Sequence, residues 1–159
     1  MLHLVCVHPE IPQNTGTLIR TAACLHFELH LVEPLGFLMR NKHLERSHMD
    51  YKDHAHLTLH SSFQAFYTSA KTRKRRLIAL DARASQPFYD FSFQPNDMLL
   101  LGSESKGLSN EHLAQMDAQI TLPMATKRRS LNMAIAGSIA ISHALLQLNL
   151  WPTASSYSL

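Results

Sequence analysis

Short apolar runs recur along this 159-residue chain, and most are followed by a segment with helical periodicity. A parallel pair of strands needs a crossover long enough to hold a helix, so alternating strands and helices favour a mainly parallel sheet. The predicted fold class is therefore α/β, with helices on both faces of one sheet. The predicted strands cover residues 2–7, 29–32, 57–59, 77–80, 98–101 and 120–122.

Helical periodicity fills most of the gaps between these strands. In the first helix Leu18, Ile19 and Ala22 share one arc of the helical wheel, whereas Gly16 and Arg20 fall outside it. Arg20 is therefore expected to point away from the core. We place Asn14 at the N-cap of the first helix and Ser130 at the N-cap of the last. The predicted helices cover residues 14–26, 41–46, 62–69, 110–116 and 131–148.

Composition narrows the class of protein. Hydrophobic residues make up 45% of the chain and charged residues 17%, which is typical of a compact globular protein. We expect one domain over residues 1–151 and a loose tail over residues 152–159. Cys6 and Cys24 each lie in an apolar segment, which favours buried reduced thiols over a disulfide or a zinc site.

No export signal is evident at the N-terminus, so we expect a cytoplasmic protein. Polar residues interrupt the one long apolar stretch, 131–150, which argues against a membrane span.

The turn after the strand at 98–101 indicates a ligand site. Gly102 and Gly107 bracket it and allow backbone groups to approach a ligand closely, while Glu104 and Lys106 supply an acceptor and a donor. Neither a phosphate loop nor a dinucleotide-binding fingerprint fits, because Leu108 follows the second glycine and no third glycine opens a helix. A plain glycine-bearing turn remains an alternative for this segment taken alone.

Two further motifs also fall where a strand gives way to a helix. The first runs from Asn14 to Arg20, and the second runs from Pro123 through the cations 127–129 to Ser130. The carboxyl ends of parallel strands meet at one edge of the sheet, which is where such sheets bind ligands. The net charge of +3 is compatible with nucleic acid, and the cluster 127–129 could touch phosphates. For the second basic cluster, residues 71–76, we favour a solvated loop.

The chain holds 11 histidines, which raises the alternative of a metal site. His56 and His60 would share a face of one short strand, but their spacing along it is too large for easy chelation. We therefore expect no metal.

Together the motifs resemble a known family. The patterns Asn14-x-Gly16-x-x-x-Arg20, Leu101-Gly102-Ser103-Glu104-x-x-Gly107-Leu108 and Ser130-Leu131-Asn132 look like the three motifs of the SPOUT-class RNA methyltransferases. Within that class, residues 9–16, residues 30–37 and the pair Asp50-Tyr51 are similar to the minimal tRNA wobble-nucleotide 2′-O-methyltransferases. The last helix departs from those enzymes, with Ala134-Ile135 and Ser142-His143 where they usually carry Ser-Asn and Tyr-Glu. We interpret His143 as a satisfied core histidine.

The resemblance implies a homodimer with a deep C-terminal trefoil knot, S-adenosylmethionine as cofactor and tRNA as partner. The implied product is a 2′-O-methyl group on the wobble nucleotide, cytidine or uridine 34, with S-adenosylhomocysteine released. By matching positions it assigns the cofactor site to Leu80, Gly102, Glu104, Gly107, Leu122, Ser130 and Asn132. It assigns RNA contacts to Asn14, Arg20, Lys127, Arg128 and Arg129, and catalysis to Arg20 and Ser130.

A ribose hydroxyl is a weak nucleophile, so methyl transfer needs in-line positioning and stabilisation of the charge that develops on oxygen. We interpret Arg20 as a cation that binds the neighbouring phosphate and this oxygen, because a guanidinium is hard to deprotonate in a protein. The proton could leave through water or through the Ser130 hydroxyl. Two alternatives stay open, a methyltransferase of the same fold acting on another tRNA or rRNA site and a non-catalytic RNA- or cofactor-binding module.

Overall fold

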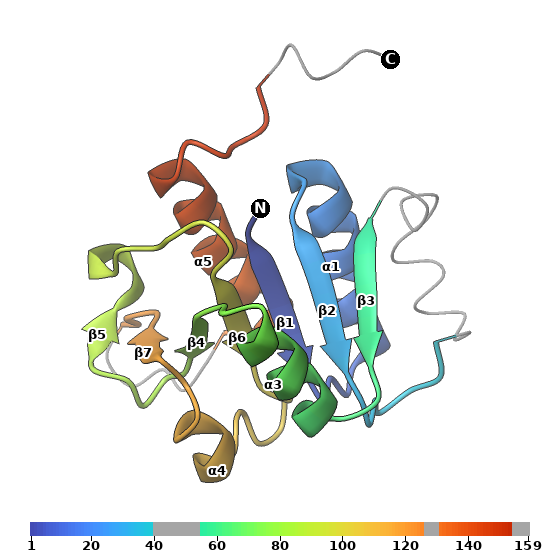
Figure 1. Cartoon of the computed structure of the whole chain (residues 1–159). Helices are drawn as coiled ribbons and strands as arrows, with labels where there is room; N and C mark the ends of the chain where they lie inside the picture. Colours follow the sequence, from blue (N-terminus) through green and yellow to red (C-terminus); the bar gives the residue numbers. More distant parts are fainter. Residues whose placement is uncertain (40–54, 126–130, 154–159) are drawn as a thin grey trace.

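A single parallel sheet lies between two layers of helices in the computed structural model, which describes residues 1–39, 55–125 and 131–153 (Figure 1). Its strand order is β3-β2-β1-β6-β4-β7-β5, and every neighbouring pair is parallel. The predicted α/β class is confirmed. The strands are β1 (His3–Val7), β2 (Glu28–Val32), β3 (His56–His60), β4 (Leu77–Leu80), β5 (Gln86–Pro87), β6 (Met98–Leu101) and β7 (Ala118–Thr121).

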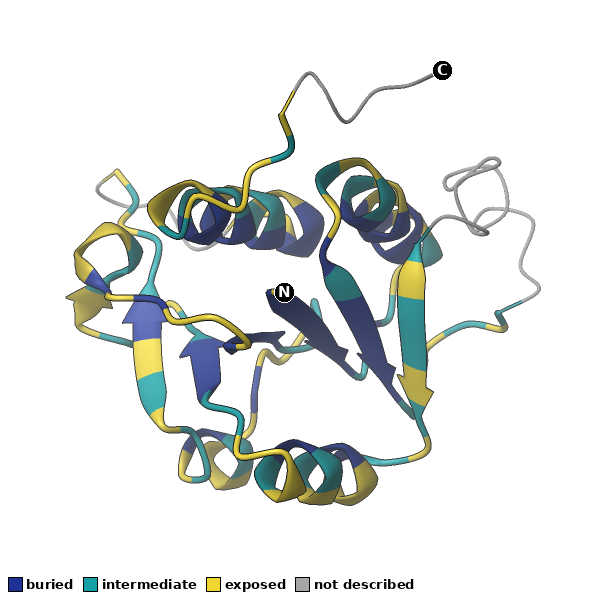
Figure 2. Ribbon diagram, turned by 45° about the horizontal axis from the view of Figure 1, so that its top comes forward, coloured by how far each residue is buried: buried dark blue, intermediate teal, exposed yellow. Residues whose placement is uncertain are grey.

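In the described ranges, two helices cover each face of the sheet. Figure 2 shows them packing their buried sides inward, with α1 and α5 on one face and α3 and α4 on the other. The predicted helix 41–46 and most of the predicted tail lie outside the described residues, and the short β5 with the 3-10 helix after it was not predicted. The helices are α1 (Pro12–Leu25), α3 (Phe63–Thr72), α4 (Asn110–Leu113) and α5 (Met133–Gln147), and the 3-10 helix is η2 (Phe88–Asp90).

Side-chain alternation along the central strands builds two hydrophobic cores. In β1, Leu4 and Cys6 pack toward α1 and α5, whereas Val5 and Val7 pack toward α3. All residues of β1 and β6 are buried. Strands covered on both faces read as continuous apolar runs, which is why the sequence reveals them.

Both predicted helix caps need correction. Helix α1 is capped by Ile11 and begins at Pro12, because the fixed φ of proline suits a first helical turn and its missing N–H is no loss there. Asn14 is therefore inside the helix, and Gly16 is buried rather than outside the core-facing arc. Helix α5 is capped by Asn132, whose side-chain oxygen accepts from two backbone N–H groups. Ser130 lies outside the described residues.

Two further expectations about single residues are only partly met. Cys6 is buried, and burial followed by the nearby Glu104 charge raises the pKa of its thiol. Cys24 is exposed in the last turn of α1, so its predicted burial is wrong.

His143 packs edge-on against Phe88, with ring centroids 5.1 Å apart. Its Nε2 is buried without a hydrogen-bond partner in the described part of the chain, so the interpretation as a satisfied histidine is wrong.

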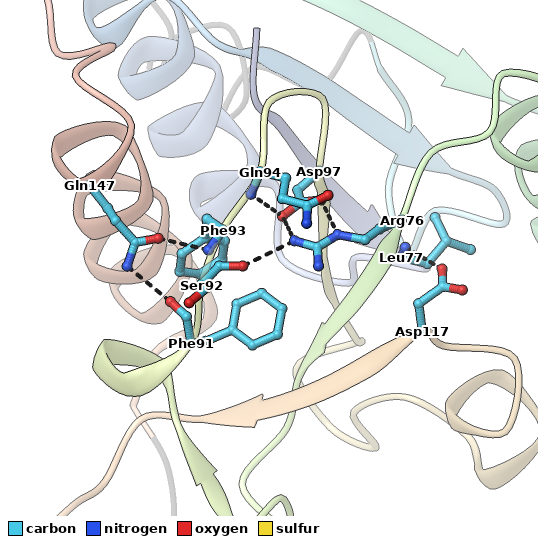
Figure 3. Close-up of polar contacts among 9 residues, drawn as sticks. All are labelled: Arg76, Leu77, Phe91, Ser92, Phe93, Gln94, Asp97, Asp117 and Gln147. Carbon is cyan, nitrogen blue, oxygen red and sulfur yellow. Dashed lines mark hydrogen bonds and ion pairs between the residues drawn. The ribbon is translucent and has the colours of Figure 1, made fainter.

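The basic cluster 71–76 is more ordered than a solvated loop. Arg76 forms two hydrogen bonds of 2.8 and 2.6 Å to the buried carboxylate of Asp97 and a third to the Ser92 carbonyl (Figure 3). Lys71 lies in α3 and donates to both carboxylate oxygens of Asp117, which also accepts from the Leu77 N–H. These ion pairs hold the amino ends of β4, β6 and β7 together.

No helix within residues 1–39, 55–125 and 131–153 is both long and apolar enough to cross a membrane.

Replacing Asp97 tests this polar network. Asp97→Asn removes the charge that Arg76 faces and one acceptor for the Gln94 N–H, so we expect the free energy of unfolding to fall by about 1.5–3 kcal/mol. Urea denaturation measures the change. The matched control is Asp90→Asn, an exposed position in η2, which should shift the free energy of unfolding by less than about 0.5 kcal/mol. Equal losses in the two variants would contradict this account.

Candidate active site

A cavity of about 540 Å³ opens at the carboxyl ends of β4, β6 and β7. Its walls combine apolar side chains with polar loop groups, and the start of α5 closes one side. This volume and mixed lining are typical of small-molecule sites. The lining residues are Ile11, Asn14, Leu80, Asp81, Ala82, Arg83, Leu101 to Gly107, Thr121, Leu122, Met124, Leu131, Asn132, Met133 and Ala136.

The loop after β6 is a tight reversal that requires both glycines. The Gly107 N–H donates to the Ser103 carbonyl at 2.8 Å, and these two residues form an isolated antiparallel bridge. A Cβ on Gly102 would lie 2.0 Å from the Gly107 carbonyl carbon and 2.2 Å from the Leu108 nitrogen. Gly107 has a φ of 67° and open space around it. Gly102 is therefore required by close approach, and Gly107 by backbone conformation.

Glu104 joins this loop to the entrance of α1. Its carboxylate accepts from the Glu10 N–H at 2.7 Å, the Ile11 N–H at 3.2 Å and the Asn14 side-chain nitrogen at 3.0 Å. Three donors leave little acceptor capacity for a substrate proton. Glu104 is thus placed to position the loops rather than to act as a base.

Asn14 extends this chain of hydrogen bonds to α5. Its side-chain oxygen accepts from the Asn132 side-chain nitrogen at 2.8 Å, and the Asn132 oxygen caps α5 through Ala134 and Ile135. Each amide has only one orientation that satisfies all partners, because Glu104 accepts and the helix N-terminus donates. One polar chain therefore links the three sequence motifs.

Two contacts at the rim were missed by sequence reasoning. The Glu10 carboxylate accepts from the Ser105 N–H at 2.9 Å and from its hydroxyl at 2.7 Å, which mirrors the bonds that Glu104 receives from residues 10–14. Arg83 forms two side-chain bonds to Asp81, which lower the pKa of that carboxyl, and also reaches the Leu108 carbonyl. The position of Asp81 directly after a predicted strand was the available signal. Nothing in the sequence marks Glu10 as a partner of Ser105.

The cavity brings together most of the residues predicted for the cofactor site. Arg20 is exposed on α1 and is absent from the cavity lining. Asn14 is buried, and both its side-chain nitrogen and oxygen have protein partners, which favours a positioning role over an RNA contact. Lys127, Arg128, Arg129 and Ser130 lie outside the described residues. The predicted residues that line the cavity are Asn14, Leu80, Gly102, Glu104, Gly107, Leu122 and Asn132.

The sequence profile of the SpoU rRNA Methylase family matches residues 1–142 of this chain. A tRNA (cytidine(34)-2′-O)-methyltransferase of Beijerinckia indica is 42% identical over 145 residues, covering 91% of each chain. A Yersinia pestis protein of the same name is 40% identical over 153 residues, covering 93% of this chain and 94% of its own.

Solved structures agree with these sequence matches. One, described as giving insights into the 2-OH methylation of C/U34 on tRNA, superposes with a TM-score of 0.89 at 46% identity and covers 94% of this chain and 97% of its own. The SpoU methyltransferase AviRb of Streptomyces viridochromogenes, solved with its cofactor AdoMet, superposes with a TM-score of 0.87 at 24% identity. It covers 94% of this chain and 61% of its own, and at that identity it supports the fold alone.

The two glycines of the loop after β6 should respond differently to alanine. Gly107→Ala forces an alanine into a left-handed conformation, which costs roughly 1–2 kcal/mol. Gly102→Ala introduces a backbone clash that only a rebuilt loop can relieve, so we expect a larger loss of stability. Urea denaturation of both variants measures the difference. An equal or larger loss in Gly107→Ala would contradict the tight-reversal geometry.

The polar chain predicts a rescue between two substitutions. Asn14→Asp places a second carboxylate beside Glu104, so stability at pH 7 should fall through like-charge repulsion. Glu104→Gln supplies an amide that can donate to that new carboxylate. The double variant should therefore lose at least about 0.5 kcal/mol less than the sum of the two single losses, measured by urea denaturation. Strict additivity would show that these side chains are not directly coupled.

Proposed function

This chain belongs to the SpoU methylase family, and we propose that it transfers a methyl group from S-adenosylmethionine to the ribose 2′-hydroxyl of cytidine or uridine 34 in tRNA. The observation that carries the proposal is the cavity at the carboxyl ends of the strands, around which one hydrogen-bond chain connects all three sequence motifs. The relatives named for nucleotide 34 of tRNA support the choice of substrate. The methyltransferase domain would comprise residues 1–151 and work in the cytoplasm.

The cavity fits such a cofactor in size and chemistry. Its volume lies within the range of about 300–1,000 Å³ typical of small-molecule sites. Leu80 and Leu122 offer apolar walls suited to an adenine ring, and the Gly102–Gly107 reversal leaves backbone groups accessible. When bound, the cofactor supplies an electrophilic methyl group on a sulfonium. Glu104, Asn14 and Asn132 hold the surrounding loops in place for it.

The reaction also needs a group that binds the RNA beside the attacking oxygen. We assign this role to Arg20, whose guanidinium would bind the adjacent phosphate and stabilise negative charge developing on the 2′-oxygen. The proton of the hydroxyl would pass to water or to Ser130. The cations Lys127, Arg128 and Arg129 would add phosphate contacts, and their sequence position next to the motif that ends at Asn132 supports this.

A homodimer would bring Arg20 to the cavity. Arg20 is exposed on α1 and does not line the cavity of its own chain. Helix α5 packs beside α1 (Figure 1). It leaves Ile135, Ile139 and Leu146 exposed by 53%, 39% and 60%, at spacings that place them on one side of the helix. An apolar stripe of this kind suits a second copy of the chain. Arg20 of one copy would then act at the cavity of its partner.

The resemblance to the family also supports a C-terminal trefoil knot. In this chain the loop that follows β6 borders the same cavity as Leu122 and Met124 after β7 and Leu131 before α5, as knot loops around a cofactor would.

Methyl transfer from labelled S-adenosylmethionine to tRNA lacking the wobble modification tests the function. Nucleoside mass spectrometry should find the 2′-O-methyl group at nucleotide 34, and Arg20→Ala should lower the turnover about 10²–10³-fold. Arg20→Lys should be similarly poor, whereas Arg73→Ala, an exposed arginine after α3, should leave turnover unchanged. Cofactor binding without any labelling of tRNA would favour a binding module. A methyl group at another nucleotide would show that the chain acts on a different RNA site.

Mixed dimers test the shared site. Co-expressed Arg20→Ala and Gly102→Ala chains should regain activity, because one cavity of the mixed dimer pairs an intact loop with an intact Arg20. If Arg20 acts within its own chain, the mixture stays as inactive as either variant alone.

A further inference from the structure

Three side chains of types that can bind a metal ion meet on the sheet face that α3 covers, at the amino-terminal end of the strands. His3 lies in β1, and Glu28 and His30 lie in β2. The parallel register sets His3 beside Glu28 and Val5 beside His30, so alternation brings all three side chains to the same face. His3 and His30 are buried, with exposed fractions of 2% and 6%.

Their donor atoms are spaced like the corners of a metal coordination shell. His3 Nδ1 lies 3.1 Å from His30 Nε2, Glu28 Oε2 lies 3.2 Å from His3 Nδ1, and Glu28 Oε1 lies 3.4 Å from His30 Nε2. Zinc bonds of about 2.0–2.1 Å in a tetrahedron place neighbouring ligand atoms about 3.3–3.4 Å apart. The ligand atoms of the three side chains are therefore already spaced as an ion between them would require.

The neighbours of these groups support the same arrangement. His30 Nδ1 lies 3.0 Å from His60 Nε2, and the Thr58 hydroxyl donates to Glu28 Oε1 at 3.0 Å. Metal-ligating histidines commonly donate their second ring N–H to a hydrogen-bond acceptor, and His60 Nε2 is placed to accept from His30.

We propose that His3, Glu28 and His30 form a binding site for a divalent cation of the zinc type, with water as the remaining ligand. The site is separate from the cavity, which lies at the opposite, carboxyl-terminal end of the strands. It does not depend on the proposed methyl transfer. The pair His56 and His60, which the sequence offered for chelation, does not form it, because His56 is exposed and packs against His26.

Arg75 competes with the ion. Its guanidinium contacts His3 Nε2 and can only donate, so this contact needs the His3 tautomer with its proton on Nδ1. A metal at Nδ1 needs the opposite tautomer, with the proton on Nε2 facing Arg75. Binding therefore requires Arg75 to withdraw, and a glutamine at this position could instead accept the Nε2 proton.

The experiment uses the full chain without an affinity tag, stripped of metal and titrated with Zn²⁺ at pH 7 by calorimetry. We expect one ion per chain and a rise in Tm on binding. Glu28→Gln and His30→Gln should each weaken affinity by at least about 10-fold, and Arg75→Gln should strengthen it. The control His56→Gln, an exposed histidine on the neighbouring strand, should bind as the original chain does.

Cobalt gives a second readout that a loss of folding cannot imitate. Co²⁺ bound to the original chain should show the intense visible absorption of a tetrahedral site, stronger still in Arg75→Gln at limiting metal and lost in Glu28→Gln. Circular dichroism reports whether each variant is folded. Zn²⁺ binding that survives in both Glu28→Gln and His30→Gln would overturn the proposal, and so would the absence of binding to Arg75→Gln. In either case the three side chains would form a hydrogen-bonded cluster only.

Discussion

The Glu104 carboxylate is the contact on which the arrangement of the cavity depends. The loop after β6 and the start of α1 are far apart in the sequence, so the covalent chain does not fix their relative positions. Glu104 fixes them by accepting two backbone N–H groups and one amide from residues 10–14, and Asn14 transmits the connection to the cap of α5. The same groups satisfy helix-end donors that would otherwise lack partners. Local secondary structure and site geometry therefore rest on one set of hydrogen bonds.

The two ends of the parallel sheet have different polar chemistry. At the carboxyl ends, glycine turns and helix starts leave backbone groups around a cavity, as is general for such sheets. At the amino ends, charged and imidazole side chains pair with one another, as in Arg76 with Asp97 and in the cluster of His3, Glu28 and His30. Because the central strands β1 and β6 are buried over their full length, the hydrophobic cores on both faces of the sheet separate the two ends.

The sequence predicted the parts of the molecule that depend on local pattern. Buried strands are recognisable in the sequence as apolar runs. The polar residues that directly follow them indicated the edge of the sheet at which the cavity lies. The start of α1 was misplaced because Asn14 has the chemistry of a cap, whereas its amide is used in a contact with residues far along the chain. The pairing of Glu10 with Ser105 and the meeting of His3 with His30 depend on loop shape and strand register. Neither leaves a periodic signal in the sequence.

The order of strands has a consequence for synthesis on the ribosome. Strand β1 emerges first, yet one of its two neighbours is β6, and the cap of α5 bonds to Asn14 across 118 positions of sequence. A nascent chain that ends before Met98 can form the β1–β2 and β2–β3 pairs, but the other edge of β1 stays open, and β4 has neither of its partners. The sheet is complete only after β6 has inserted between β1 and β4 and β7 between β4 and β5, and the cavity walls close only when α5 has left the exit tunnel. Until β6 pairs with β1, the growing chain presents an apolar strand edge that a chaperone can shield.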